Sequence, residues 1–288
     1  MSFHKALEEL GHEVLPCGEG HAQKDIKEMA KVLVNQYDLF IDLDCGRNGK
    51  GELHFQNKEG DVPIPSAAWF IDSHNHHYAS LHHRISKHYN HIFFAVWDRR
   101  DRFAKHPSTH WAPNATDSYW FDKGIYNSIT VWPKFEVGFF GSKGGLDRAD
   151  MLRTVCTRRS LKHDIREIGR TYKVRWPRTA EAMYNCKYLF NKSQKHDGPN
   201  QRVMESMIMG RPLITDRDPR SGMSKLFEEG THYLGYTNES ELGNQIDWLN
   251  HSENQPIVAN IVKSAYEEVK KNHQVKNRVE QIMEVCFK

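Results

Sequence analysis

The stretch 185–215, NCKYLFNKSQKHDGPNQRVMESMIMGRPLIT, decides the fold of this chain. An apolar run ends at Asn191 and is followed by a polar loop, a segment with apolar residues at helical spacing, and a second apolar run after Gly210. This order predicts a strand, a loop, a helix at 200–209 and a strand at 212–215. Units of this kind build parallel sheets, so the chain is expected to be an α/β protein.

The polar groups of this stretch lie where a parallel sheet tends to bind anions. Backbone N–H groups at the start of a helix hold phosphate, and Arg202 adds a fixed positive charge there. Glu205, one turn further on, can accept hydrogen bonds from ribose hydroxyls. The plainer interpretation is a capped helix with Arg202 and Glu205 as a surface pair. The candidate ligand-binding residues are Asn191, Asp197, Gly198, Asn200, Arg202 and Glu205.

A second candidate segment is 137–148, VGFFGSKGGLDR, where a predicted strand at 135–140 runs into a glycine-rich turn. Small residues let the backbone approach a phosphate, and lysine or arginine neutralises its charge. The spacing fits neither a P-loop nor the dinucleotide-binding fingerprint, and a flexible turn explains it equally well. The candidates here are Gly141, Ser142, Lys143 and Arg148.

A third segment, 69–91, places Asp72 and His74 just after a predicted strand. Side chains at that end of an open parallel sheet face the ligand crevice. Either residue is a candidate general base or a ligand of an acceptor hydroxyl. Six more histidines follow by residue 91, but their spacing matches no compact metal motif.

Alternating helix and strand patterns extend over most of the chain. Further strands are expected at 12–17, 38–43, 67–71, 91–96 and 188–190. Helices are expected at 3–10, 25–34, between the strands at 67–71 and 91–96, at 148–158, 223–229 and 239–250, and over most of 257–287. The aperiodic segment 112–135 is the expected linker, and 46–60 an exposed loop. The sequence therefore predicts two Rossmann-like domains, 1–130 and 131–288, with a ligand cleft between them.

Composition narrows the class of protein. The five cysteines among 288 residues are scattered without a CxxC pair, and no apolar stretch approaches the ~18 to 20 residues that span a bilayer. A cytoplasmic protein without a membrane span is expected. Although the net charge is only +3, six basic residues fall in 84–106 and nine in 151–178. These stretches indicate either a polyanionic or phosphate-bearing ligand or solvated basic faces.

The segments, in this order, resemble the CgeB-like (spore-maturation protein) branch of the GT-B glycosyltransferases, which is related to glycosyltransferase group 1. The matching pieces are 6–14 (ALEELGHEV), 69–74 (WFIDSH), 111–117 (WAPNATD), 137–142 (VGFFGS), 191–215, 226–230 (LFEEG), 233–236 and the final helices through Arg278. The resemblance implies parallel sheets facing across a cleft, with final helices that pack back toward the N-terminal domain. It also implies a nucleotide sugar, foremost a UDP-sugar, in the C-terminal domain, an acceptor in the N-terminal domain, and no obligatory metal.

The resemblance assigns roles to the candidate residues. It places Gly141 and Ser142 beside the donor diphosphate, lines the nucleotide-sugar pocket with Asn200, Arg202 and Glu205, and turns Asp72 and His74 toward the acceptor. Two departures are visible. Leu213 stands eight positions after Glu205, where many group 1 enzymes carry a second glutamate. The chain also begins in a predicted helix, which indicates an abbreviated N-terminal domain or a truncated start.

Three hypotheses of function follow. The first is transfer of a sugar to a hydroxyl acceptor. The basic stretches favour a hydroxymethylated base in bacteriophage DNA, turned out of the stack; a protein, a spore-coat or cell-surface polysaccharide or a small molecule are the other acceptors. The second is a non-catalytic module that keeps the fold. The third is a metal-dependent hydrolase built on the histidine-rich segment.

Relatedness to group 1 favours retention at the anomeric carbon, whereas Asp72 or His74 as base permits inversion. The sequence carries no signal for the sugar or the oligomeric state.

Overall fold

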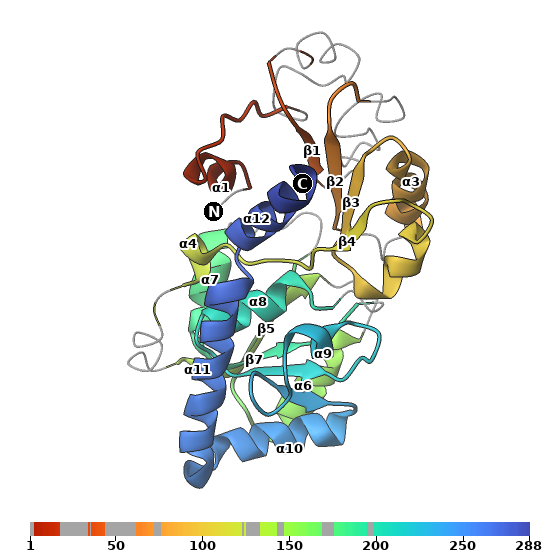
Figure 1. The fold of residues 1–288 in the computed structure, drawn as a ribbon. Coiled ribbons are helices and arrows are strands. Elements are labelled where there is room, and N and C mark those ends of the chain that lie inside the picture. The colour runs from red at the N-terminus through yellow and green to blue at the C-terminus, as the bar shows by residue number, and fades with distance from the viewer. Residues whose placement is uncertain are drawn as a thin grey trace. The chain divides into compact units, whose positions relative to one another are not determined.

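The computed structural model describes residues 3–17, 34, 36–43, 62–71, 76–122, 124, 133–142, 147–168, 176–194 and 198–288. They form two compact units (Figure 1). Unit 1 consists mainly of Ala115–Gln194 and Gly198–Gln274, and unit 2 mainly of Ser2–Asn114 and Val275–Lys288. Each unit holds one parallel sheet, as the α/β prediction requires.

The sheet of unit 2 has four parallel strands in the order β1-β2-β3-β4. The strands are β1 (Phe40–Leu43), β2 (Ser66–Phe70), β3 (His91–Phe94) and β4 (Thr109–Trp111). The helices are α1 (Phe3–Glu9), α3 (His76–Ser86), the 3-10 helix η1 (Trp97–Phe103) and α12 (Val275–Cys286).

Strand β2 is the centre of the unit 2 core because all five of its residues are buried. Phe70 packs with Ile85 of α3 on one face of the sheet. Trp69, its neighbour in the strand, packs with Ile282 of α12 on the other face. Successive strand residues point to opposite faces, so helices cover both faces of this sheet.

The sheet of unit 1 has five parallel strands in the order β6-β5-β7-β8-β9. The strands are β5 (Phe135–Ser142), β6 (His163–Ile168), β7 (Cys186–Asn191), β8 (Leu213–Asp216) and β9 (Leu234–Tyr236). The helices are α4 (Ser118–Phe121), α6 (Arg148–Arg158), α7 (Trp176–Tyr184), α8 (Gln201–Ile208), α9 (Met223–Leu226), α10 (Glu239–Asn250), the 3-10 helix η2 (Ser252–Asn254) and α11 (Gln255–Asn272).

Strand β7 shows how the unit 1 core is divided. Leu189 packs with Met204 and Met207 of α8 on one face of the sheet. Tyr188 and Phe190 pack on the other face, among residues of α6 and α10. Helices therefore cover both faces of this sheet as well.

Several predicted elements differ from the structure. The strand predicted at 12–17 is absent, since these residues form no ladder; Pro16 among them has no N–H to donate to one. The segment predicted as an aperiodic linker contains α4, whose first turn is capped by Asp117 accepting a hydrogen bond from the Tyr119 N–H (3.1 Å). The loop at 46–60, and the helix at 25–34 apart from residue 34, lie outside the described residues. Within the described part of the chain, no helix is long and apolar enough to span a membrane.

Candidate functional site

The order of strands in unit 1 locates a ligand crevice. Strand β5 has β6 on one side and β7 on the other, so α6, which follows β5, and α8, which follows β7, depart in opposite directions. In open α/β sheets, ligands bind outside the carboxyl ends of the strands at such a switch point. The ends of β5 and β7 are the places where the sequence predicted donor-binding residues.

Arg202, in the first turn of α8, lies against the end of β5. Its Nε donates a hydrogen bond to the carbonyl oxygen of Phe140. A Cβ atom added to Gly141 would lie 2.9 Å from Cζ of Arg202 and 2.9 Å from Cζ of Phe139. Gly141 is therefore required because the guanidinium packs directly on the strand backbone.

Arg148, the first residue of α6, approaches the same place from the other side of the switch point. Its side chain is buried, and its guanidinium donates to the carbonyl oxygen of Lys192 (3.2 Å) and to Oε1 of Gln194 (3.3 Å). Cζ of Arg148 lies 5.6 Å from the centre of the Phe139 ring, and Cζ of Arg202 lies 5.7 Å from it. Two guanidinium groups are thus held close to one buried ring, and guanidinium groups are well suited to bind phosphate.

Glu205 lies one turn after Arg202. Its side chain keeps some exposed surface, yet burial of the carboxyl raises its pKa to about 7, against the opposing effect of Arg202. At neutral pH this carboxyl is present in both forms. The ionised form accepts hydrogen bonds from hydroxyl groups, as the predicted ribose contact requires.

Asn191 and Gly198 lie beneath the candidate site and contact the residues around it. Asn191 is completely buried, donates from Nδ2 to Oγ1 of Thr215 (2.9 Å), and accepts at Oδ1 from Nδ2 of Asn200 (3.1 Å). A Cβ atom on Gly198 would lie 2.7 Å from Cβ of Ser221. Asn191 therefore positions Thr215 and Asn200, and Gly198 leaves room for the Ser221 side chain.

The structure brings Gly141, Arg148 and Arg202 together, with Glu205 one turn further along α8. Ser142 ends β5, but its side chain lies outside the described residues. The predicted residues Asp72, His74, Lys143 and Asp197 also lie outside them, so their roles stay predictions. Leu213, the departure from the group 1 pattern, is buried in β8.

The histidine-rich segment provides no metal site in the described part of the chain. There, no group of three or more His, Cys, Asp or Glu side chains could hold a metal ion. His82 of α3 is completely buried and stacks on Phe70 with ring centroids 4.3 Å apart. This histidine is a core residue.

Two features were missed at the sequence level. One is the Phe139 ring, whose position under both arginines depends on the switch point. The other is the carboxyl of Asp216 at the end of β8, which accepts a hydrogen bond from the Ser193 N–H (2.7 Å). The available signal for Asp216 was its place directly after the strand predicted at 212–215.

A protein-family model and solved structures match this chain. Residues 148–284 match the model of a family described as "Glycosyl transferase-like". A search of curated protein sequences finds no match.

Solved structures match over most of the chain. Anabaena HepE in complex with UDP and glucose has 14% identity and a TM-score of 0.62, covering 90% of this chain and 80% of that one. Sucrose-phosphate synthase from Thermosynechococcus elongatus has 10% identity and a TM-score of 0.59, covering 90% and 76%. AviGT4, a glycosyltransferase involved in avilamycin A biosynthesis, has 13% identity and a TM-score of 0.57, covering 99% and 86%. At these identities the likeness shows the fold.

Proposed function

We propose that this chain, which has the GT-B fold and a glycosyl transferase-like segment at 148–284, is a nucleotide-sugar-dependent glycosyltransferase. The observation that carries the proposal is the convergence of Arg148 and Arg202 on Phe139 beside Gly141. This arrangement suits the diphosphate of a sugar nucleotide. Glu205, nearby on α8, suits the ribose hydroxyls.

The chemistry of transfer explains the arginine pair. When the bond between the anomeric carbon and the diphosphate breaks, negative charge develops on the leaving diphosphate. Fixed cations stabilise this charge more strongly in the transition state than in the ground state. A UDP-sugar is the proposed donor, which agrees with structures of HepE that contain UDP or UDP-glucose. The finer assignment to the CgeB-like branch and the cytoplasmic location remain parts of this proposal.

The acceptor is proposed to be a hydroxyl group, with Asp72 or His74 as its ligand or base. A hydroxymethylated base in bacteriophage DNA is the acceptor that the basic stretches favour, but carboxylates neutralise part of their charge. In the stretch 151–178, each of four arginines has a carboxylate partner. They are Arg153 with Asp150 and Glu167, Arg158 with Glu239, Arg159 with Asp247, and Arg166 with Asp164.

These pairs reduce the positive field that 151–178 offers to phosphates. In 84–106, Arg99 and Arg100 are likewise paired with Asp98 and Asp101, so the positive field is reduced in both stretches. Measuring the affinity for hydroxymethylated duplex DNA at several salt concentrations tests this acceptor. An acceptor that contacts several phosphates gives a steep loss of affinity with salt. No binding at low salt would leave a protein, a polysaccharide or a small molecule as acceptor.

The donor proposal is tested by thermal unfolding with UDP-, GDP-, TDP- and ADP-sugars. A specific donor at 100 times its Kd should raise the free energy of unfolding by about 2.7 kcal/mol. Stabilisation by one nucleotide class, together with release of the nucleotide when an acceptor or water takes the sugar, supports the transferase. Stabilisation without release would support the non-catalytic module. A folded protein that none of these ligands stabilises would refute the donor site.

A further inference from the structure

A chain of hydrogen bonds runs across the ends of β7 and β8. Nδ2 of Asn200 donates to Oδ1 of Asn191 (3.1 Å), and Nδ2 of Asn191 donates to Oγ1 of Thr215 (2.9 Å). The Thr215 hydroxyl in turn donates to Oδ1 of Asp216 (3.3 Å). Every donor in this chain points along it toward the Asp216 carboxyl.

Asp216 is fixed through one oxygen. Besides the Thr215 hydroxyl, Oδ1 accepts from the Ser193 N–H (2.7 Å) and the Ser193 hydroxyl (3.2 Å). The other oxygen, Oδ2, accepts no hydrogen bond from a described residue. The residue keeps some exposed surface, and it is the last residue of β8, at the carboxyl end of the sheet.

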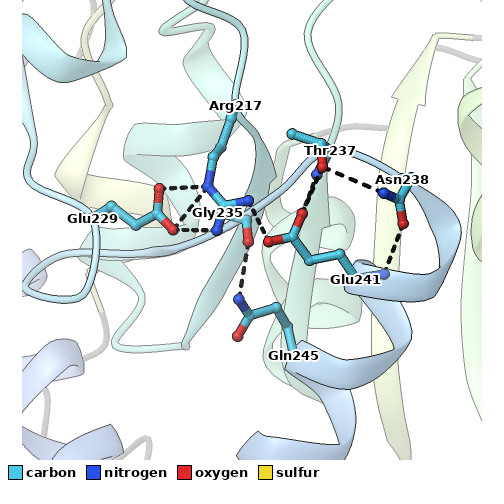
Figure 2. A network of polar contacts seen from close by, with 7 residues as sticks. All are labelled: Arg217, Glu229, Gly235, Thr237, Asn238, Glu241 and Gln245. Atoms are coloured by element: carbon cyan, nitrogen blue, oxygen red, sulfur yellow. Dashed lines mark hydrogen bonds and ion pairs between the residues drawn. The ribbon is translucent and has the colours of Figure 1, made fainter.

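The neighbouring Arg217 does not neutralise Asp216. Arg217 follows the last residue of β8, and its side chain is bound by Glu229, with Nε 2.8 Å from Oε2, and by Glu241 (Figure 2). The Arg217 N–H also donates to the carbonyl oxygen of Tyr236 (2.9 Å). This network secures the end of β8 and takes up the arginine charge, leaving the charge of Asp216 for another partner.

The other end of the hydrogen-bond chain is an acceptor too. Asn200 is only 8% exposed, and its buried Oδ1 has no hydrogen-bond partner among the described residues. A buried acceptor without a partner is costly, and an ordered water, an ion or a ligand group can satisfy it. With acceptors at both ends, the chain suits a ligand group that donates hydrogen bonds. Hydroxyl groups do so, whereas a phosphate would be repelled by Asp216.

Asp216 also lies two strands away from the end of β5, against which Arg202 packs. Strand β7 separates β5 from β8, with Gly138 of β5 in register with Leu189, and Thr215 of β8 in register with Asn191. The end of β8 therefore lies about 10 Å from the end of β5, two strand spacings away. A diphosphate held at Gly141 places an attached sugar ring within this range.

We propose that Asp216 is a further donor-binding residue that accepts hydrogen bonds from ring hydroxyl groups of the nucleotide sugar. This inference rests on the proposed function. The hydroxyl groups belong to the transferred sugar or to the ribose, since both rings present neighbouring hydroxyls.

The variant Asp216→Asn tests the proposal. It keeps an oxygen for the bonds from Ser193 and Thr215, and replaces Oδ2 with an amide donor. Asp218→Asn is the matched control, because it removes a carboxylate two residues away and keeps the oxygen that accepts from the Arg220 N–H (3.0 Å). Calorimetric titration measures the affinities of both variants and the wild type for UDP, UDP-glucose and 2′-deoxy-UDP. Unfolding curves establish that each variant folds.

The expected result is a loss of about tenfold or more in Asp216→Asn, the range for a hydrogen bond to a charged group, with no loss in Asp218→Asn. A loss for UDP-glucose but not UDP identifies the transferred sugar. A loss for UDP and UDP-glucose alike, with smaller discrimination against 2′-deoxy-UDP, identifies the ribose. A folded Asp216→Asn that binds all three ligands like the wild type overturns the inference and leaves the donor site intact. A wild type that binds none of them refutes the proposed function, and the inference with it.

Discussion

Among the described residues, two polar clusters lie at opposite ends of the parallel strands in the two units. In unit 1, Arg202 and Asp216 lie at the carboxyl ends of the strands. In unit 2, the described polar cluster lies at the amino ends, where the Ser108 hydroxyl is 2.8 Å from Nδ1 of His91 and 2.9 Å from Nε2 of His110. Ligands bind at carboxyl ends, so unit 1 presents binding groups, whereas the cluster in unit 2 satisfies its own hydrogen bonds.

Removing Arg202 should have the largest effect on ligand binding by unit 1. We expect Arg202→Ala to weaken binding of a UDP-sugar by roughly 100-fold, because a charge-assisted contact to the diphosphate is lost. The matched control is Arg166→Ala, which removes an arginine paired with Asp164 on the edge strand β6. Calorimetric titration of both variants checks this. Equal affinities in the two variants would contradict the placement of the diphosphate.

Filling the space at Gly141 should have the next largest effect. In Gly141→Ala the new methyl group displaces the Arg202 guanidinium, so we expect about a tenfold loss of donor affinity and a destabilisation of about 1 to 3 kcal/mol. Gly138→Ala is the control on the same strand, since its methyl group would lie 2.4 Å from Sγ of Cys186. It should lower stability in urea unfolding while the folded fraction keeps its affinity. A tight-binding Gly141→Ala would mean that Arg202 does not hold the ligand.

The sequence predicted the parts of this site that depend on local pattern. The helix predicted at 148–158 has the bounds of α6, and α8 agrees within one residue at each end, because apolar residues recur at helical spacing within polar boundaries. Strand β6 was missed because three of its six residues, Asp164, Arg166 and Glu167, are charged, as its place at the edge of the sheet allows. Long-range contacts were beyond prediction, since Arg158 and Arg159 pair with Glu239 and Asp247, more than 80 residues away.

The raised pKa of Glu205 gives the donor site a pH dependence. Ribose hydroxyls favour the carboxylate, so a proton must leave when the donor binds below pH 7. We expect the affinity for a UDP-sugar to fall as the pH drops from 8 to 6, by up to about tenfold per pH unit. Titrations at several pH values check this, with Glu205→Gln as the variant that should bind more weakly and flatten the profile. A wild-type profile identical to that of Glu205→Gln would contradict the role of the carboxyl.

The histidine cluster gives the stability of unit 2 a pH dependence of its own. Burial and neighbouring imidazoles lower the pKa values of His91 and His110. Since the unfolded chain then binds protons more readily, their contribution is present above pH 6.5 and is lost as the pH falls below it. The raised pKa of Glu205 acts the other way, because its stabilisation is present at low pH and is lost as the pH rises from about 4.5 through 7.

Urea unfolding at pH 7.5 and pH 5.5 separates the two effects. The double variant His91→Asn, His110→Asn should lose less stability than the wild type on acidification. Over the same change of pH, the free energy of unfolding should rise less in Glu205→Gln than in the wild type, each protein being compared with its own value at pH 7.5. This is the smallest of the expected effects, and a double variant with the wild-type pH profile would contradict it.

The central claim is that the carboxyl ends of β5 and β7 in unit 1 bind the nucleotide sugar. Hydrogen exchange of the wild-type protein with and without UDP-glucose tests it most directly. We expect slower exchange in peptides that cover 139–142 and 198–208, and unchanged exchange at the amino-end cluster of unit 2 in peptides that cover 106–110. Protection confined to the cluster, or absent from 198–208 while the ligand is bound, would contradict the claim.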